Sequence, residues 1–457
     1  MANLRVGAAK VCINPTPDMY PFPVRKCDWG VDAFSPAEVY DDMNCRAIAI
    51  DNGNKTILLL TYELGSVPDC PDLAQQISDL TGVCADDIMI IATHNHTCAR
   101  PVKFMGKYMP GVTQEQMDFE RKNTQIQVDS GLEACKKAME TLRPARYGYG
   151  EVMSYVNTNR DTETPFGYWV EARNLAGYSD KTLAIVKFVD MDGKLIAALL
   201  NHGTHATCAY LMKDADGKAK TSGNFNGIAC KFVEEHYGNG AVAMWTSGAA
   251  GNQNPLLSHG MQYEYPDGYS TNVNYPDGVG FMQMELMGRT HGADAVKGLD
   301  SITKYSENLP ISHLKKCVML PTQKEKGNDS GKPPIYRAGY QGIRTGSEAP
   351  ELPKLPVMED DPEHPAQLKM QLLMLGDIAV LMANAELYAQ IGRDMKAASP
   401  YRKTFVVTHS DVSIGYVLDK SSADEKVFQA FSPVKPGGAD ELILGCEEAL
   451  FDELLGK

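Results

Sequence analysis

The sequence predicts a mixed α/β (α+β) fold, in which helices flank mixed β-sheets and residues 1–457 form one unit. Three observations lead to this prediction. Short apolar runs with strand composition alternate with longer runs that have the spacing of amphipathic helices. The turn-forming pairs Asp192-Gly193 and Gly376-Asp377 separate neighbouring apolar runs, as in hairpins. No stretch has the composition of an interdomain linker, so we expect the elements to share one fold.

The predicted strands are short runs rich in Ile, Leu, Val, Ala and Thr. They cover residues 45–50, 56–62, 88–93, 182–189, 195–200, 241–246, 368–375 and 378–384. The third run leads directly into two histidines one residue apart. Because successive side chains of a strand point to opposite faces, His94 and His96 are expected to point the same way.

The predicted helices have apolar residues at helical spacing, often with start and stop signals at their ends. They cover residues 71–81, 113–142, 225–237, 281–298, 387–398 and 439–455. The clearest begins at Thr113, where Gln116 forms the second half of a capping-box pair. Pro144 follows shortly after the end of this helix, where it cannot extend it.

Two segments lie outside these elements. Residues 259–280 are rich in tyrosine and contain the turn sequence Tyr-Pro-Asp-Gly twice, which predicts a long loop. Such a loop is either a binding loop or plain surface. Residues 321–365 are rich in proline, glycine and charge, and we expect a large excursion or insertion there rather than a domain boundary.

The composition excludes some classes of function and favours a compartment. A net charge of -14 without a local basic cluster argues against nucleic-acid binding. No run is long and apolar enough to predict a membrane span, and the N-terminus lacks the layout of a signal peptide. The 11 cysteines include no C-x-x-C pair, which favours reduced thiols in the cytoplasm. Secretion with a few disulfides is the alternative.

Polar clusters follow four of the predicted strands. They are Thr93-His94-Asn95-His96, Asn201-His202-Gly203-Thr204-His205, the stretch TSGAAGNQNP at 246–255, and Asn384-Ala385-Glu386. Four of the 10 histidines fall in two of these clusters. Because functional sites in α/β proteins form where loops leave the strand ends, we expect the clusters to meet.

A zinc ion suits this combination of residues. Neutral imidazole and carboxylate oxygen are common zinc ligands, and a catalytic zinc keeps one position open for water. An H-x-H pair, a histidine from a second loop and a glutamate from a third would make such a set. From the pattern alone two other interpretations stay open: acid/base groups, or strand-end histidines that are merely hydrogen-bonded.

Taken together, the motifs resemble the catalytic N-terminal domain of the neutral/alkaline ceramidase family. The stretches that carry the resemblance occur in the family's order along nearly the whole chain. They are VGAAKVCINPTP, DDMNCRA, ATHNHTCARP, HGTHATCA, SGNFNGIA, GAAGNQNP, GDIAVLMANAELYAQIG and IGYVLD. The resemblance implies a ceramidase-like catalytic domain over residues 1–457, with a metal site at strand ends.

The resemblance also implies roles for individual residues. The family's four zinc ligands match His94, His205, Glu386 and Tyr416, which predicts one zinc ion. His96 matches a histidine beside the metal, with an expected role as general acid/base or oxyanion donor. Arg160 matches an arginine that lines the pocket, and it could clamp the carboxylate of a small anionic substrate. His202 is expected to be structural, and Glu63 is a candidate support for the metal ligands.

Departures from the family pattern change the expected substrate. The serine of the family's G-D-V-S-P motif is implicated in catalysis, and Asn254 stands in its place. Asn254 could orient a carbonyl but cannot be a nucleophile. The aspartate of the same motif aligns with Asn252, and Phe431 replaces a tyrosine. The chain ends at Lys457, which leaves no room for the immunoglobulin-like C-terminal domain of longer members. We therefore expect a substrate other than ceramide.

These observations predict a zinc-dependent hydrolase that cleaves an amide or related carbonyl bond of a small molecule, and Arg160 would allow that molecule to be anionic. The attacking group would be a water molecule whose pKa zinc lowers toward about 7. One alternative is a metal-dependent lyase or isomerase that uses the same site. The other is a non-catalytic metal-binding or ligand-binding relative. The sequence does not predict an oligomeric state.

Overall fold

The structure is a computed structural model, and it describes most of the chain. The described residues are 4–20, 22–25, 34–99, 103–104, 107–108, 112–163, 169–209, 213–257, 262–264, 270–272, 277–327 and 355–457. Within them, no helix is long and apolar enough to cross a membrane.

Two large sheets form the centre of the molecule. The first has eight strands in the order β15 (Val242–Ser247), β13 (Leu195–His202), β12 (Thr182–Asp190), β9 (Arg143–Met153), β1 (Arg5–Cys12), β4 (Asn44–Asp51), β5 (Thr56–Tyr62) and β6 (Ile88–Ala92). The second has four strands in the order β19 (Ile311–Leu320), β22 (Ala366–Leu375), β23 (Ile378–Ala383) and β25 (Lys403–Val407).

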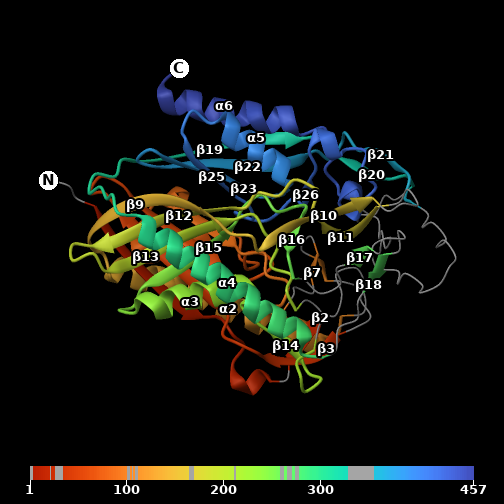
Figure 1. The fold of residues 1–457 in the computed structure, drawn as a ribbon, viewed down its shortest axis with the longest axis horizontal. Coiled ribbons are helices and arrows are strands. Elements are labelled where there is room, and N and C mark those ends of the chain that lie inside the picture. The colour runs from red at the N-terminus through yellow and green to blue at the C-terminus, as the bar shows by residue number, and fades with distance from the viewer. Residues whose placement is uncertain are drawn as a thin grey trace.

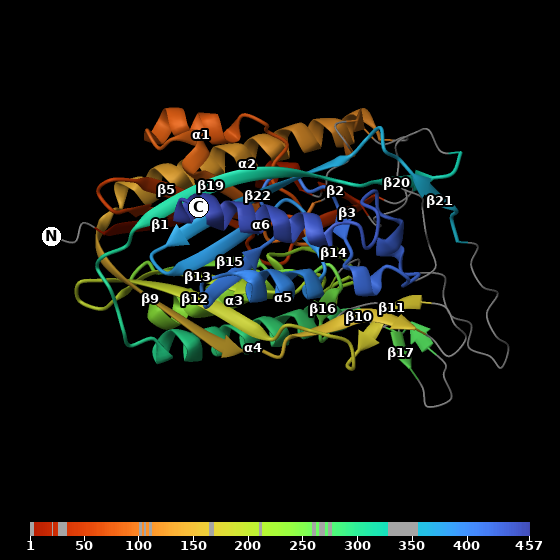
Figure 2. The same cartoon turned by 90° about the horizontal axis from the view of Figure 1, so that it is seen from above.

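The two sheets pack face to face, and helices cover their outer faces, so the fold has four layers (Figure 1). One core cluster joins Val186 and Ile48 of the first sheet to Val380 and Phe405 of the second. The helices are α1 (Leu73–Thr81), α2 (Gln114–Glu140), α3 (Asn224–Tyr237), α4 (Val279–Ser301), α5 (Ala389–Ala398) and α6 (Asp440–Leu455). Helices α1 and α2 cover one half of the eight-stranded sheet, α3 and α4 cover the other, and α5 and α6 cover the four-stranded sheet (Figure 2).

Smaller elements surround these layers. A five-stranded sheet contains β16 (Gln253–Pro255), β10 (Asn157–Glu163), β11 (Trp169–Asn174), β17 (Gln262–Glu264) and β18 (Ser270–Asn272). A three-stranded sheet contains β14 (Ala219–Thr221), β3 (Phe34–Val39) and β2 (Phe22–Arg25). The two-stranded pairs are β7 (Lys103–Phe104) with β8 (Lys107–Tyr108), β20 (Gln323–Glu325) with β21 (Met358–Asp360), and β24 (Glu386–Leu387) with β26 (Tyr416–Val417). Short 3₁₀ turns occupy Pro17–Met19, Ala85–Asp87, Lys420–Ser422 and Phe428–Phe431.

Most neighbouring strands of the two large sheets are antiparallel, but three pairs are parallel. These pairs are β5 with β6, β13 with β15, and β23 with β25. Their carboxyl ends meet: Ile91 bridges to Ser410, and the amide of Thr408 donates to the carbonyl of Ser247. The loops after the three pairs therefore converge on one region between the sheets, which is where functional sites form in sheets of this kind.

The predicted fold class is confirmed, as are all six predicted helices and the predicted strands. The capping box at Thr113 is present, and helix α2 is continuous. The hairpin turns are also present, with Gly193 and Gly376 at positive φ. The strands that were not predicted include β9, β10, β19 and β25. Most of the tyrosine-rich loop and residues 328–354 of the predicted insertion lie outside the described residues.

Candidate metal centre

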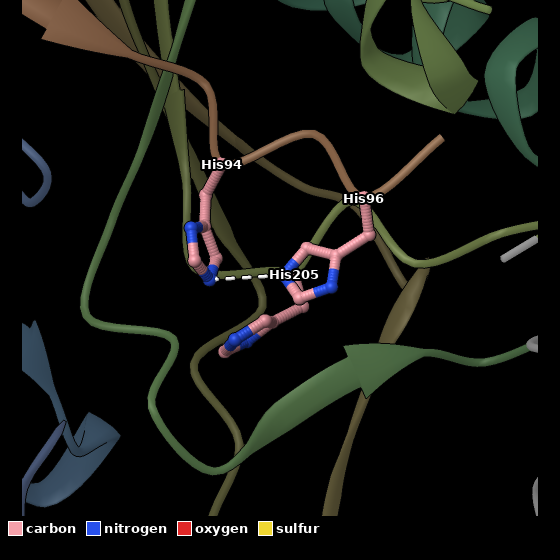
Figure 3. A group of neighbouring side chains, drawn as sticks. All are labelled: His94, His96 and His205. Carbon is pink, nitrogen blue, oxygen red and sulfur yellow. Dashed lines mark hydrogen bonds between the residues drawn. The ribbon is translucent and has the colours of Figure 1, made fainter. Parts of the chain in front are cut away.

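The four predicted metal ligands come together at the converging strand ends. His94 follows β6, His205 follows β13, and Glu386 follows β23. Glu386 begins β24, where it lies opposite Tyr416 of β26 in a parallel pair. His94, His96 and His205 point toward a common region (Figure 3).

The distances between the ligand atoms fit a tetrahedral zinc site. His94 Nε2 lies 3.2 Å from Glu386 Oε2, and His205 Nε2 lies 3.3 Å from the same oxygen. Tyr416 Oη lies 3.5 Å from His205 Nε2. Four ligands at ordinary zinc bond lengths on the corners of a tetrahedron would be about 3.3 Å apart. The donor set of two imidazoles, a carboxylate and a phenol oxygen therefore fits the ion in chemistry and in spacing.

Hydrogen bonds on the far side of each imidazole select the tautomer that a metal needs. Nδ1 of His94 donates to the carbonyl of Gly65 at 3.0 Å. Nδ1 of His205 donates to the carbonyl of Ala250 at 2.6 Å. Because a carbonyl only accepts, the proton of each neutral ring lies on Nδ1 and the lone pair of Nε2 faces the centre.

The charge state of these groups also suits a cation. Burial lowers the pKa of His205 to about 4, so this ring is neutral at pH 7. Burial alone would raise the pKa of Glu386, but the neighbouring His94 and His205 hold it well below its usual range. Burial raises the pKa of Tyr416 well above its usual value, and the neighbouring carboxylate of Glu386 adds to this effect. The protein thus presents the neutral ring of His205 and the carboxylate of Glu386 to the centre.

His96 lies against the ligands rather than apart from them. Its Nε2 is 3.0 Å from Nε2 of His94 (Figure 3). Since His94 Nε2 has a lone pair to accept with, His96 donates this hydrogen bond in the protein without metal. Burial lowers the pKa of His96 well below its usual value, and His94 lowers it further. His96 is therefore neutral and next to the ion position, where it is suited to proton transfer or to ligation.

Arg160 is fully engaged at both terminal nitrogens. Its Nη2 donates to the carbonyl of Gly251 at 2.6 Å and to Tyr416 Oη at 3.1 Å. Its Nη1 donates to Asn254 Oδ1 at 3.2 Å and lies 3.4 Å from Glu171 Oε1. Only 2% of Arg160 is exposed. The guanidinium thus connects Tyr416, a predicted ligand, to the polar side chains of Asn254 and Glu171.

Asn254 is held by three partners. Its Nδ2 donates to Glu171 Oε1 at 2.6 Å, while its Oδ1 accepts from Arg160 and from Thr207 Oγ1 at 3.3 Å. The side chain is buried in this network. Asn254 therefore fixes Glu171 beside Arg160. Glu171 was not predicted from the sequence, because its role depends on the pairing of β10 with β11 and with β16.

Asn95 fixes the segment between the two histidines. Its Nδ2 donates to the carbonyls of Glu63 at 3.0 Å and of Ser222 at 2.6 Å. Its Oδ1 accepts from the amide of Thr97 at 2.8 Å. Glu63 thus supports the site through its backbone, while its buried carboxylate pairs with Arg46.

His202 stays outside the group of ligand atoms. It is fully buried, its Nδ1 lies 2.6 Å from Thr204 Oγ1, and its Nε2 lies 3.1 Å from the carbonyl of Ser154. Both ring nitrogens therefore have partners within the protein. This arrangement matches the structural role expected for it.

His409 is a residue of the centre that the sequence did not reveal. It follows β25, its ring stacks on that of His94 with centroids 3.9 Å apart and an interplanar angle of 13°, and 3% of it is exposed. One ligand atom each from His94, Glu386 and His409 lie within 4.8 Å of one another. The available signal was the stretch FVVTH at 405–409, in which an apolar run ends in Thr-His, as ATH does at 92–94.

A separate cavity of about 230 Å³ lies near the strand ends but does not contain the centre. It is bordered by Gly203 and Gly248, in the segments that follow β13 and β15. Asp180 and Lys396, which pair with each other, also line it. None of the predicted metal ligands lines this cavity, so the chemistry is to be sought at the histidines.

Comparison with known proteins shows similarity of structure without a match in sequence. No protein-family model matches the chain, and no curated protein matches it. The solved structure of neutral ceramidase from Pseudomonas aeruginosa is similar with a TM-score of 0.69 and 17% identity, over 99% of this chain and 74% of that chain. A structure described as ceramidase complexed with C2 is similar with a TM-score of 0.70 and 17% identity, over 99% and 75% of the two chains. The fold is therefore ceramidase-like, as expected.

Proposed function

We propose that the protein is a zinc-dependent hydrolase that cleaves an amide or related carbonyl bond in a small polar molecule. The observation that carries this proposal is the spacing of His94, His205, Glu386 and Tyr416 around one point. When bound there, a zinc ion supplies a Lewis acid and an acidified water molecule. The ceramidase-like fold supports the proposal, since a ceramidase cleaves an amide bond.

The side chains around the ion position would have separate roles in catalysis. His94, His205, Glu386 and Tyr416 would hold the ion, and the backbone carbonyls of Gly65 and Ala250 keep the two imidazole rings oriented. His96 moves a proton at its Nε2, which lies next to the ion position. Arg160 holds Tyr416 in place. No step needs a serine, which agrees with the presence of Asn254 where the resemblance predicts a nucleophile.

The wall formed by Arg160, Asn254 and Glu171 supports a polar substrate. Arg160 and Glu171 carry opposite charges at 3.4 Å, with the amide of Asn254 bonded to both. A wall of charged and amide groups favours a substrate with hydrogen-bonding groups near the scissile bond, whereas an acyl chain offers no polar group to it. We therefore propose a small polar amide rather than ceramide.

The proposal is tested with a panel of N-acyl amino acids, N-acyl amines, lactams and lactones, offered to protein reconstituted with zinc. We expect hydrolysis of at least one polar member, with oxygen-18 from labelled water in the acid product. Turnover without incorporation of oxygen-18 would favour the lyase or isomerase. His364→Gln is a matched control, because His364 is an exposed histidine that pairs with Asp361 away from the centre.

A further inference from the structure

His409 is a buried imidazole whose ring nitrogens have no hydrogen-bond partner in the described part of the chain. Only 3% of the residue is exposed, and its contacts at the centre are the stacked ring of His94 and the nearby carboxylate of Glu386. A ring nitrogen that has no protein partner is free to bind a cation that reaches it.

The backbone adds a second sign that this position is specialised. His94 and His409 both have φ of 57°, in the left-handed region that residues with a side chain rarely adopt. Each follows a strand, β6 or β25, with a threonine between. Strain of this kind persists where the surrounding structure imposes it, commonly at functional sites. The two rings are thus presented to the same region in the same way.

The geometry of the stack decides which ion His409 can bind. An imidazole binds a metal along a lone pair that lies in the plane of the ring. The planes of His94 and His409 are nearly parallel, at 13°, and their centroids are 3.9 Å apart. Two parallel planes cannot both contain one ion, so His409 does not add a ligand to the ion that His94 binds. An ion bound by His409 would be displaced from the first by about the spacing of the rings.

We propose that the centre has a second divalent-cation position between Glu386 and His409, beside the ion held by His94, His205, Glu386 and Tyr416. This proposal rests on the proposed function for the first ion. Hydrolytic sites with two metals place the ions about 3.5–4 Å apart, and the centroids of the two stacked rings are 3.9 Å apart. Glu386, whose carboxylate lies near His94, His205 and His409, would be shared by the two positions.

The ligands predict the kind of ion and the strength of its binding. An imidazole and a carboxylate suit zinc, cobalt and manganese rather than calcium. The second position has one protein ligand of its own, His409, and it shares the carboxylate of Glu386 with the first position. The second ion is therefore held more weakly than the first, and it exchanges with free metal in solution.

The test is a titration of the metal-free protein with cobalt(II), in which equilibrium dialysis counts bound ions and visible absorption reports their coordination. We expect about two ions per chain in the wild type, the second being weaker, and about one in His409→Phe. Phenylalanine keeps an aromatic ring against His94 and removes both ring nitrogens, so the first ion should stay. His364→Gln, on the surface, should still bind both ions.

Each outcome is informative. One ion in both the wild type and His409→Phe would overturn the second position and leave the zinc site intact. Two ions in His409→Phe would show that His409 is not the ligand. No bound ion in the folded wild type would overturn the proposed function as well. If His409→Phe fails to fold, as judged by circular dichroism, His409→Asn replaces it. In manganese-loaded wild type we expect an electron paramagnetic resonance signal from two coupled ions, and uncoupled manganese alone would contradict the proposal.

Discussion

Nε2 of His94 lies 3.2 Å from Oε2 of Glu386, although the two residues leave strands of different sheets. His94 follows β6 of the eight-stranded sheet, and Glu386 follows β23 of the four-stranded sheet. Their contact depends on the face-to-face packing of the two sheets. The packing of the core therefore brings the two halves of the candidate centre together.

His96 is predicted to move protons without being needed to hold the ion. His96→Gln should lower kcat about 100-fold or more on the substrate found in the panel, since general acid/base groups contribute about 10²–10⁴. The zinc content, measured by mass spectrometry, should stay near one or two ions per chain, as in the wild type. Loss of zinc from His96→Gln would instead make His96 a ligand. His364→Gln should match the wild type in both measurements.

Arg160 is predicted to position Tyr416. Lysine lacks the fork that donates to Gly251 and to Tyr416 Oη at the same time. Arg160→Lys should weaken zinc binding about tenfold, which is the effect typical of residues that support a ligand. Competition with a chromophoric chelator measures the change. Unaltered affinity would mean that Tyr416 needs no support, and Arg121→Lys on the surface of α2 is the matched control.

Asn95 is predicted to stabilise the fold as well as the site. Asn95→Ala leaves the carbonyls of Glu63 and Ser222 and the amide of Thr97 without their partner. The free energy of unfolding should fall by about 2–4 kcal/mol, because several buried groups lose a hydrogen bond. Urea denaturation measures it. A change no larger than that of Asn54→Ala, in an exposed turn, would show that water replaces the amide at no cost.

Glu447 on α6 is predicted to make stability depend on pH. Burial raises its pKa to about 8 from the usual 4.5, and within the described residues neither carboxylate oxygen has a partner. The folded state therefore keeps a proton that the unfolded state releases above pH 4.5, so stability falls as the pH rises from about 4.5 to 8. Glu447→Gln removes this loss.

The variant and the wild type should be equally stable near pH 4, and the variant more stable by about 4 kcal/mol at pH 8. Thermal or urea unfolding at both values measures the difference. Glu448→Gln, next in the chain and exposed, should follow the wild type at both values. Parallel curves for the wild type and Glu447→Gln would show that the Glu447 carboxyl titrates normally in the folded protein.

The sequence predicts those elements of the fold whose signals lie within a single short segment. All six helices were predictable because their apolar spacing and end signals lie within each segment. The hairpins at Gly193 and Gly376 were predictable because glycine is needed where φ is positive. Strand β25 was missed because its apolar stretch is short and begins with Lys403 and Thr404. Missing that strand concealed the histidine that follows it.

The residues of the site also fall into two groups, those that the sequence predicts and those that only the folded structure shows. His94, His205 and Glu386 are visible in the sequence because each lies in a polar cluster at the end of an apolar strand. Glu171 is not visible, since its contact with Asn254 depends on the register of three strands. The engagement of Arg160 at both terminal nitrogens is equally a tertiary feature. The sequence predicts that Arg160 clamps the substrate, whereas its contacts in the structure favour a role in supporting Tyr416.

The most direct test of the account is the metal content of protein purified without chelator and supplied with zinc, compared with His94→Ala and Glu386→Ala. We predict at least one tightly bound zinc ion per chain in the wild type and its loss in both variants, which should remain folded by circular dichroism. A folded wild type that binds no zinc, or variants that bind it as tightly as the wild type, would contradict the metal centre on which the proposed function depends.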